Sequence, residues 1–251
     1  MLEARAETDQ QPPTSKPRIL VCTFAYNEGI KIEAAVQRIL ASSPYETLVM
    51  DDGSNDGSIE KLRSFPVKIL SNTLNQGIGF AMKRAFEYSL ENGYDIVVIV
   101  AGNNKDDPKE IPRLVAPILQ EGYDFVQGSR FLTGGGHGNM PMYRQFATRV
   151  HPVLFSLVAR KWVTESTNGF RAFRTSILLD PRILWRDGWL DKYELEPYLL
   201  FKTIRLGYRH TEVPVTKIYP PKSLGYTKMK AVTGWWSILR PIVYLGLGIR
   251  K

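Results

Sequence analysis

Three short polar clusters stand out in the first half of the 251-residue sequence, and each directly follows a run of apolar residues. They are residues 25–28 (Ala-Tyr-Asn-Glu), 51–54 (Asp-Asp-Gly-Ser) and 102–107 (Gly-Asn-Asn-Lys-Asp-Asp). Carboxylate and amide oxygens accept hydrogen bonds from a base or from ribose hydroxyls, whereas two adjacent carboxylates repel a bare phosphate. The clusters therefore indicate a ligand with a neutral, hydrogen-bonding part. The alternative is that each cluster only caps a helix.

The elements that must position these clusters can be read from the apolar pattern. Apolar runs predict β-strands at residues 18–24, 47–50, 67–71 and 95–100. The segments between them have helical spacing, most clearly at residues 28–41 and 76–90. This alternation predicts an α/β fold with a mostly parallel sheet and helices on both faces. Ligands of such sheets bind at the carboxyl ends of the strands, so the three clusters are expected to converge on one edge.

Familiar motifs of nucleotide-binding and hydrolytic sites are largely missing. The sequence has neither a Walker phosphate-binding pattern nor a Gly-x-Ser-x-Gly nucleophile elbow. Its three histidines lack the spacing of metal ligands, and a single cysteine, Cys22, excludes a disulfide framework and a clustered-cysteine zinc site. Residues 75–79 (Asn-Gln-Gly-Ile-Gly) open a predicted helix, where glycines would let a ligand approach the backbone closely. They lack the third glycine of the dinucleotide fingerprint, so this segment alone identifies no ligand.

The basic charge of the chain is concentrated at its C-terminal end. Ten basic residues and one acid, Glu212, lie between Lys202 and Lys251, so this segment has a net charge of +9 within a total of +8. Residues 231–251 combine two tryptophans, an apolar run and flanking cations, which predicts an amphipathic segment on an anionic membrane surface. The alternative is a helix that docks on the domain, and binding of nucleic acid is not favoured. Residues 1–17 are polar and predict a flexible tail without a secretory signal.

Seven sequence blocks follow one another in order between about residues 18 and 230. The blocks are residues 24–28, 49–58, 75–81, 106–108, 128–131, 168–173 and 212–215. Together they resemble the family 2 nucleotide-sugar glycosyltransferases, and in particular the dolichyl- or polyprenyl-phosphate sugar transferases. The resemblance implies a GT-A fold, in which a nucleotide-binding α/β half is joined to an acceptor region.

The resemblance also implies roles for individual residues. The nucleotide-sugar donor would be bound by Ala25, Tyr26, Glu28, Asp51, Asp52, Gly79 and Asn103. Arg130 and Arg144 correspond to arginines that face the donor and acceptor phosphates in lipid-phosphate transferases. Glu165 stands four residues before Gly169, where the family usually has an aspartate.

One departure from the family concerns its metal site. The family usually has Asp-x-Asp after the fourth strand, where it holds a divalent metal on the diphosphate, and those positions here are Ala101 and Asn103. An amide is a poor ligand for a hard cation, so the sequence predicts that metal use is weakened or lost. We hypothesise that the ammonium of Lys105 neutralises the diphosphate instead, assisted by Arg130. If Mg²⁺ or Mn²⁺ is used, Asn103 and Asp107 would hold it.

These features predict an inverting transfer of a sugar from a nucleotide-sugar donor to a phosphate- or lipid-linked acceptor, at the cytoplasmic inner face of a membrane. A phosphate acceptor is already anionic and needs no base, whereas a saccharide hydroxyl needs a carboxylate such as Glu165, Glu194 or Glu196. A protein that binds sugar nucleotides without catalysis is the other interpretation. Residues 133–139, with four glycines, predict a mobile loop over the site.

Overall fold

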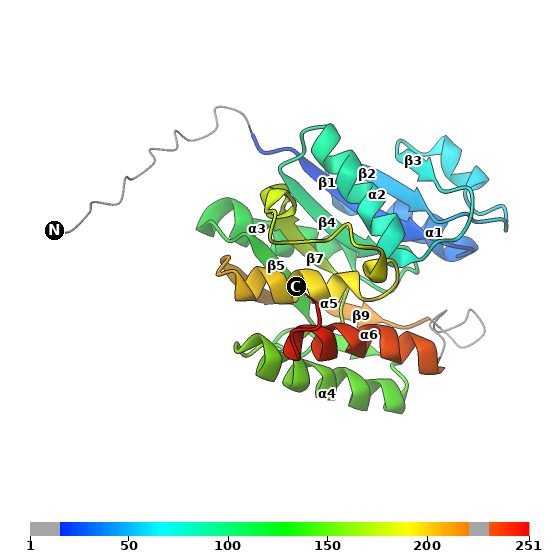
Figure 1. Ribbon diagram of the computed structural model, residues 1–251. Coiled ribbons are helices and arrows are strands. Elements are labelled where there is room, and N and C mark those ends of the chain that lie inside the picture. Colours follow the sequence, from blue (N-terminus) through cyan, green and yellow to red (C-terminus); the bar gives the residue numbers. More distant parts are fainter. Residues whose placement is uncertain (1–15, 221–230, 251) are drawn as a thin grey trace.

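The computed structural model of the chain describes residues 16–220 and 231–250. Its centre is a seven-stranded sheet in the order β3-β2-β1-β4-β7-β5-β8 (Figure 1). The strands are β1 (Ile19–Ala25), β2 (Glu46–Asp51), β3 (Lys68–Ser71), β4 (Ile96–Ala101), β5 (Phe125–Ser129), β7 (Arg171–Arg174) and β8 (His210–Pro214). Neighbouring strands are parallel except where β7 pairs with β4 and β5. The predicted α/β class with a mostly parallel sheet is therefore confirmed.

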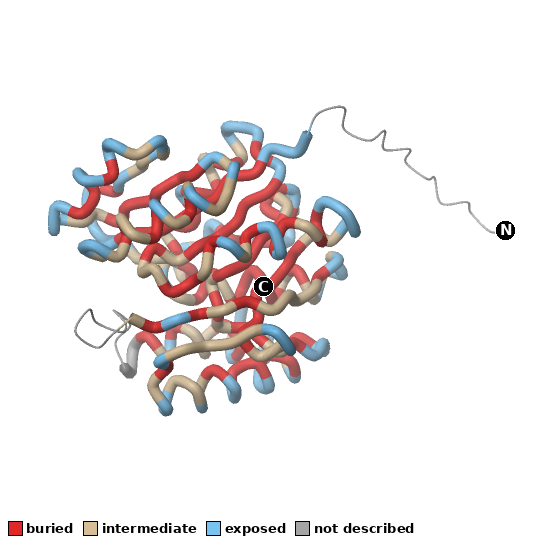
Figure 2. The backbone as a smooth tube through the Cα atoms, turned by 180° about the vertical axis from the view of Figure 1, so that it is seen from behind, coloured by how far each residue is buried: buried red, intermediate tan, exposed pale blue. Residues whose placement is uncertain are grey.

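Helices cover both faces of this sheet. They are α1 (Ile30–Ser42), α2 (Ile78–Glu91), α3 (Ile111–Glu121), α4 (Met142–Ala159), α5 (Leu195–Arg205) and α6 (Ala231–Gly246), with short 3-10 helices η1 (Glu60–Ser64), η2 (Pro108–Glu110), η3 (Thr175–Leu179) and η4 (Gly188–Leu190). Successive side chains of a strand point to opposite faces. Leu20 and Cys22 therefore pack in one cluster with Phe86 of α2, whereas Val21 packs in another with Leu114 of α3. The central strands form the buried middle of the molecule (Figure 2).

Two glycines determine where the helices beside the ligand-binding edge begin. Gly29 precedes α1 with a φ of 57°, and Gly77 precedes α2 with a φ of 116°. Residues with a Cβ rarely adopt such angles, so each glycine allows the chain to turn sharply before the helix starts. Both helices consequently begin two residues later than the apolar spacing predicts.

The prediction of a mobile loop at residues 133–139 is wrong in part, because three of these residues form a strand. β6 (Gly136–Gly138) pairs in parallel with β9 (Thr216–Ile218) in a separate two-stranded sheet. Gly138 also has a packing reason to lack a side chain, since a Cβ there would lie 2.9 Å from Cδ1 of Ile218. The glycines of this segment therefore allow β6 to lie close to β9, in addition to giving the backbone conformational freedom.

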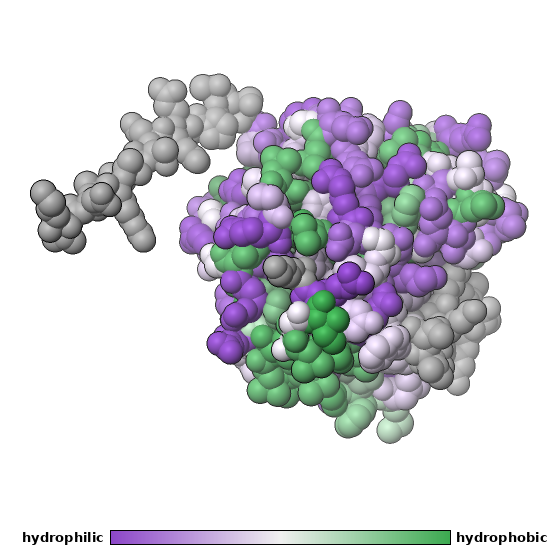
Figure 3. All heavy atoms as spheres, in the orientation of Figure 1, coloured by the Kyte–Doolittle hydropathy of each residue, from purple (hydrophilic) through white to green (hydrophobic). Residues whose placement is uncertain are grey.

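The C-terminal helix α6 packs against α4 and α5 (Figure 1). Arg240 holds it there by donating hydrogen bonds to the carbonyl oxygen of Trp189 and to the carboxylate of Glu194. The inner side of α6 therefore agrees with the alternative prediction, that of a helix docked on the domain. On its outer side Trp236 and Leu247 are exposed, and hydrophobic side chains gather over the lower part of the surface (Figure 3).

Two sequence-based expectations about the ends of the chain concern residues that the structure covers only in part. Most of the predicted tail at residues 1–17 and the predicted boundary at residue 230 lie outside the described residues. Within residues 16–220 and 231–250, no helix combines the length and the apolar composition needed to cross a bilayer.

The buried His210 makes the fold sensitive to acid. Its side chain in β8 is 8% exposed, and neither ring nitrogen has a hydrogen-bond partner among the described residues. Burial, with smaller contributions from Lys161 and Arg171, lowers the pKa of His210 to about 3. The unfolded chain, with an ordinary histidine pKa near 6.5, binds the proton first as the pH falls, so stability is lost between about pH 6.5 and pH 3.

We expect His210→Leu to reduce the loss of unfolding free energy between pH 7 and pH 5 by about 2 kcal/mol, because this titration is removed. Urea unfolding at the two pH values measures the difference. An identical pH dependence in the variant and the original chain would contradict the assignment.

Candidate functional site

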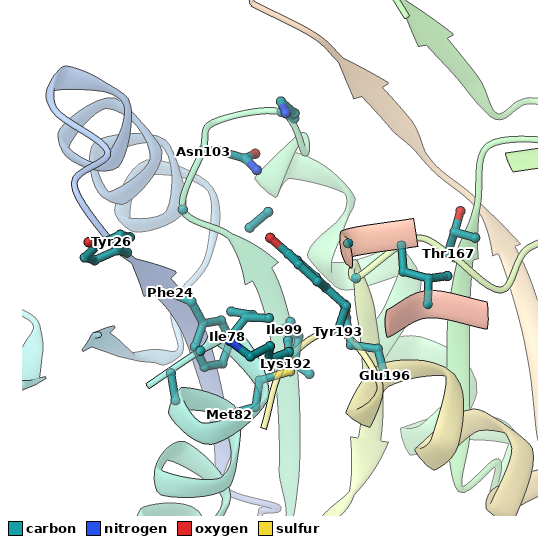
Figure 4. Close-up of a pocket in the computed structure, with 18 of the residues that line it drawn as sticks. Phe24, Tyr26, Ile78, Met82, Ile99, Asn103, Thr167, Lys192, Tyr193 and Glu196 are labelled. Carbon is teal, nitrogen blue, oxygen red and sulfur yellow. The ribbon is translucent and has the colours of Figure 1, made fainter. Parts of the chain in front are cut away.

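A cavity of about 1000 Å³ opens at the carboxyl ends of β1 and β4 (Figure 4). β1 pairs with β2 on one side and β4 on the other, so the strand order reverses here, which is where open α/β sheets bind ligands. The side of the cavity next to α2 is apolar and is formed by Phe24, Ile78, Met82 and Ile99. The polar clusters that follow β1, β2 and β4 all contribute to the wall, so their predicted convergence is confirmed.

The segment after β1 forms one end of the cavity. Ala25, Tyr26 and Glu28 line it, and the carboxylate of Glu28 lies 2.7 Å from Nζ of Lys31. Their binding of the donor stays a prediction. Tyr193 extends from the opposite side, beside Glu196, with its hydroxyl toward the side of Asn103 (Figure 4). The cavity therefore has an aromatic ring at each of two opposite walls.

The two aspartates after β2 have different environments. Asp51 accepts a hydrogen bond from the backbone N–H of Ser54 and does not line the cavity. Asp52 lines it, but its carboxylate already accepts four N–H groups, from the side chains of Asn72 and Asn75 and from the backbone of residues 76 and 77. Through these hydrogen bonds Asp52 orders the segment before α2. Direct binding of a base by either aspartate stays a prediction.

The close approach predicted for Gly79 is made to the chain's own backbone. A Cβ on Gly79 would lie 2.0 Å from the carbonyl oxygen of Leu190, and one on Gly77 would lie 2.5 Å from that of Asp191. Gly77 lines the cavity and Gly79 does not. Gly79 therefore lets α2 pack onto the segment before α5, which carries Tyr193 and Glu196.

The loop after β4 does not fit a divalent metal. Ala101 offers no ligand, and Asn103 lines the cavity with a buried side-chain oxygen that has no hydrogen-bond partner among the described residues. Asp106 is engaged by Nζ of Lys217 at 2.5 Å and by the backbone N–H of Ala101 at 2.9 Å. Asp107 pairs with Arg38 at 3.0 Å, outside the cavity lining. One neutral amide oxygen is thus left, and the described part of the chain holds no cluster of three metal-ligating side chains.

Cations occupy the wall beside the position where the family usually binds its metal. Lys105 is 6% exposed, and its Nζ lies 4.7 Å from the centre of the Tyr219 ring. Burial, and then the neighbouring charges of Lys217 and Arg144, lower the pKa of Lys105 to about 7. A bound anion would favour the protonated form, because it adds a negative charge beside the ammonium group.

Arg130 lines the cavity, and Glu165 holds it in place from behind. Glu165 is fully buried, accepts from Nε of Arg130 at 2.7 Å, and also accepts from the N–H and the hydroxyl of Thr167. Burial opposes the charge of both groups, but their pairing outweighs it, so the pKa of Arg130 is raised and that of Glu165 is lowered. Glu165 is therefore a positioning group for Arg130, and a role as base is not supported by its contacts.

Among the three glutamates considered as bases, Glu196 is the one that lines the cavity. Gly169 makes this possible, since a Cβ there would lie 2.6 Å from Oε1 of Glu196. Burial raises the pKa of Glu196, although Arg171 at 3.7 Å partly opposes the shift. Glu194 instead accepts hydrogen bonds from Arg240 and from the backbone N–H of Lys192.

The charges of the cavity wall are strongly unequal. Among the described lining residues, six are basic: Lys31, Lys105, Arg130, Arg144, Lys192 and Lys217. Three are acidic, namely Glu28, Asp52 and Glu196. Three of the cations are paired, Lys31 with Glu28 and, outside the lining, Arg130 with Glu165 and Lys217 with Asp106. Such a cavity suits a ligand with several negative charges.

Sequence reasoning missed several of these wall residues, including Lys31 and Lys192. Lys217 and Tyr219 follow the last of the seven blocks by two and four residues, and a cation directly after that block was the available indication. Tyr193 was overlooked as well, because aromatic residues before a helix are usually core residues. The contribution of Lys217 and Tyr219 depends on β9 crossing to the loop after β4, which no local pattern reveals.

Comparisons with known proteins give a consistent result. Residues 20–180 match the model of Glycosyl transferase family 2. The chain is 30% identical over 219 residues to an undecaprenyl-phosphate mannosyltransferase of Micrococcus luteus, covering 84% of this chain and 87% of the relative. It is 28% identical over 231 residues to a polyprenol monophosphomannose synthase of Mycolicibacterium smegmatis, with 88% and 84% covered.

A solved structure with the same architecture is that of glucosyl-3-phosphoglycerate synthase from Mycobacterium tuberculosis in complex with Mn²⁺ and UDP-glucose. The TM-score is 0.67 at 21% identity, and the match covers 94% of this chain and 80% of that one. At this identity the likeness shows the fold, and it confirms the GT-A type.

The contacts of Asp52 predict that Asp52→Asn destabilises the protein. The new amide keeps one acceptor and places an NH₂ group against N–H donors, so we expect a loss of about 2 kcal/mol or more in unfolding free energy. Asp107→Asn is the matched control, since its partly exposed pair with Arg38 should contribute less than about 1 kcal/mol. Equal effects of the two substitutions in urea unfolding would contradict this account.

Proposed function

Because the chain belongs to Glycosyl transferase family 2 and is a glycosyltransferase, we propose that it moves a sugar from a nucleoside diphosphate sugar to the phosphate group of a lipid at a membrane surface. The observation that carries this proposal is the excess of basic side chains around one cavity at the ends of β1 and β4. A donor diphosphate and an acceptor phosphate together bring several negative charges, which this wall can balance. The names of the two relatives, an undecaprenyl-phosphate mannosyltransferase and a polyprenol monophosphomannose synthase, support the choice of acceptor.

The cavity offers separate places for the two substrates. The base and ribose would lie at the end formed by Tyr26 and the segment ordered by Asp52. The diphosphate would then lie along Lys105 and Lys217, and the acceptor phosphate would meet Arg144 from α4. The predicted cytoplasmic, inner-face location is consistent with this arrangement and stays a prediction.

The reaction needs few proton transfers in this arrangement. An anionic oxygen of the acceptor phosphate attacks C1 of the sugar, the C1–O bond to the diphosphate breaks, and the nucleoside diphosphate leaves with the electron pair. The products are a lipid-linked glycosyl phosphate and a nucleoside diphosphate. A single displacement inverts the configuration at C1. The chain's contribution is to align two negatively charged groups and to stabilise the leaving group.

Fixed cations take the place of a metal in this proposal. The related solved structure contains Mn²⁺, but the Ala101 and Asn103 positions of this chain and the engaged Asp106 leave no carboxylate set for a divalent ion. Lys105, held at the wall where the leaving diphosphate would lie, supports the hypothesis that an ammonium group supplies the charge.

A saccharide hydroxyl is the second candidate acceptor, and one observation favours it. Glu196 lines the cavity with a raised pKa and a buried oxygen that has no hydrogen-bond partner among the described residues, as a general base could.

The metal and charge assignment predicts that transfer survives EDTA and collapses in Lys105→Ala. With polyprenyl phosphate as acceptor and a panel of UDP, GDP, CDP and dTDP sugars as donors, we expect kcat/KM to fall by about a hundredfold or more, because one fixed charge on the leaving group is lost. Lys109→Ala, a nearby exposed lysine, is the control. Full dependence on Mn²⁺ would refute the role of Lys105 but leave the reaction standing, whereas no transfer from any donor would refute the reaction itself.

Glu196→Gln distinguishes the two acceptors. A phosphate acceptor needs no base, so we expect kcat to fall by less than about tenfold and to keep its dependence on pH. Loss of about a hundredfold or more, with loss of the acid limb of the pH profile, would instead favour a hydroxyl acceptor.

A further inference from the structure

Exposed apolar side chains are concentrated on the outer side of two helices that pack on each other. Met142, Phe146 and Leu157 on α4, Trp162 just after it, and Trp236 and Leu247 at α6 are all exposed, and we call these six residues the α4–α6 face. On α4 they recur at helical spacing, while Thr148 and Phe155 on the other side are buried. Figure 3 shows hydrophobic side chains gathered where Figure 1 places these two helices. A patch of this kind needs a partner.

The charges beside the face indicate which partner it is. Residues 134–164 and 231–250 contain no Asp or Glu. Arg149, Arg160 and Lys161 are exposed on or just after α4, and Arg250 is exposed after α6. A second copy of the chain would bring cations against cations, whereas anionic lipid headgroups complement them. Trp162 and Trp236 of the face, and the exposed Tyr143 next to Met142, also suit the headgroup region.

The face is continuous with the cavity wall. Arg144 and Thr148 of α4 and Trp235 and Ile238 of α6 line the cavity from the inner side of the same helices. One layer of two helices therefore separates the anion-binding cavity from the exposed apolar surface.

We propose that the α4–α6 face docks in the plane of a lipid bilayer containing anionic headgroups, with its apolar side chains below the headgroups and its arginines and lysines among them. The proposal rests on the proposed function, because docking would bring the cavity close to an acceptor phosphate whose hydrocarbon chain lies in the membrane. In this proposal α4 and the C-terminal helix α6 contribute equally to membrane docking. The sequence alone had connected only the C-terminal segment with a membrane.

The test is sedimentation of the full chain with vesicles of phosphatidylcholine containing about one-third phosphatidylglycerol. Phe146 and Leu157 are 73% and 72% exposed, so replacing both by aspartate should leave the fold intact. We expect vesicle partitioning of Phe146→Asp/Leu157→Asp to fall on the order of tenfold or more, because two apolar side chains and the charge complementarity are lost together. Leu179→Asp, 68% exposed in η3, is the matched control and should bind as the original chain does.

The outcomes separate this proposal from the catalytic one. Binding of nucleotide sugar, and transfer to a short, water-soluble polyprenyl phosphate, should be unchanged in the double variant, while transfer to a long-chain acceptor held in vesicles should fall with partitioning. Equal vesicle binding by the double variant, or none by the original chain, would overturn the docking face. A dimer that the same double variant dissociates in analytical ultracentrifugation would also overturn it, in favour of a second copy. Vesicle binding without any sugar transfer would support docking and refute only the proposed function.

Discussion

The buried ion pair between Lys217 and Asp106 is the interaction on which the geometry of the cavity depends. Nζ of Lys217 lies 2.5 Å from Oδ1 of Asp106 and 2.9 Å from Oδ1 of Asn168. The three residues belong to β9, to the loop after β4 and to the segment before β7, so Lys217 joins two opposite walls of the cavity. Separating the pair would leave a buried charge without a partner, which is strongly unfavourable. The loop that carries Asn103 and Lys105 is consequently fixed at the wall.

The same pair decides the electrostatic character of the site. Because Asp106 is neutralised by Lys217, the acid nearest the usual metal position contributes no net negative charge. The lowered pKa of Lys105, about 7, reflects the free energy of confining it in a buried place near other cations. Binding of a polyanion relieves this repulsion, and the cations need no reorganisation when negative charge moves onto a leaving group. In the proposed reaction, Lys105 on this fixed loop would supply the positive charge beside the leaving group.

The sequence was informative wherever function rests on local pattern. The apolar runs located β1, β2, β3 and β4 to within two residues, and the polar clusters after them identified the edge of the sheet at which the cavity opens. Side-chain direction was not predictable. Asp52 turns toward the backbone N–H groups of residues 76 and 77, and Glu165 turns toward Arg130, each because of a partner far away in sequence. Gly79 has no side chain, and the space beside its Cα is taken by the carbonyl of Leu190. Lys217 escaped notice for the same reason, since only the crossing of β9 brings it to the cavity.

The two sides of α4 explain why one helix can serve two environments. Its first turn carries Arg144 to the cavity, where the positive end of the helix dipole adds to the attraction for an anion. Its outer side carries Phe146 and Leu157, which gain nothing from water and stabilise no core. Both features are explained together if the acceptor is itself divided into an anionic head and a hydrocarbon chain. Such a substrate can keep its hydrocarbon chain in the bilayer only if the anion-binding wall lies close to the membrane-facing apolar surface. Here a single layer, α4 packed against α6, carries both.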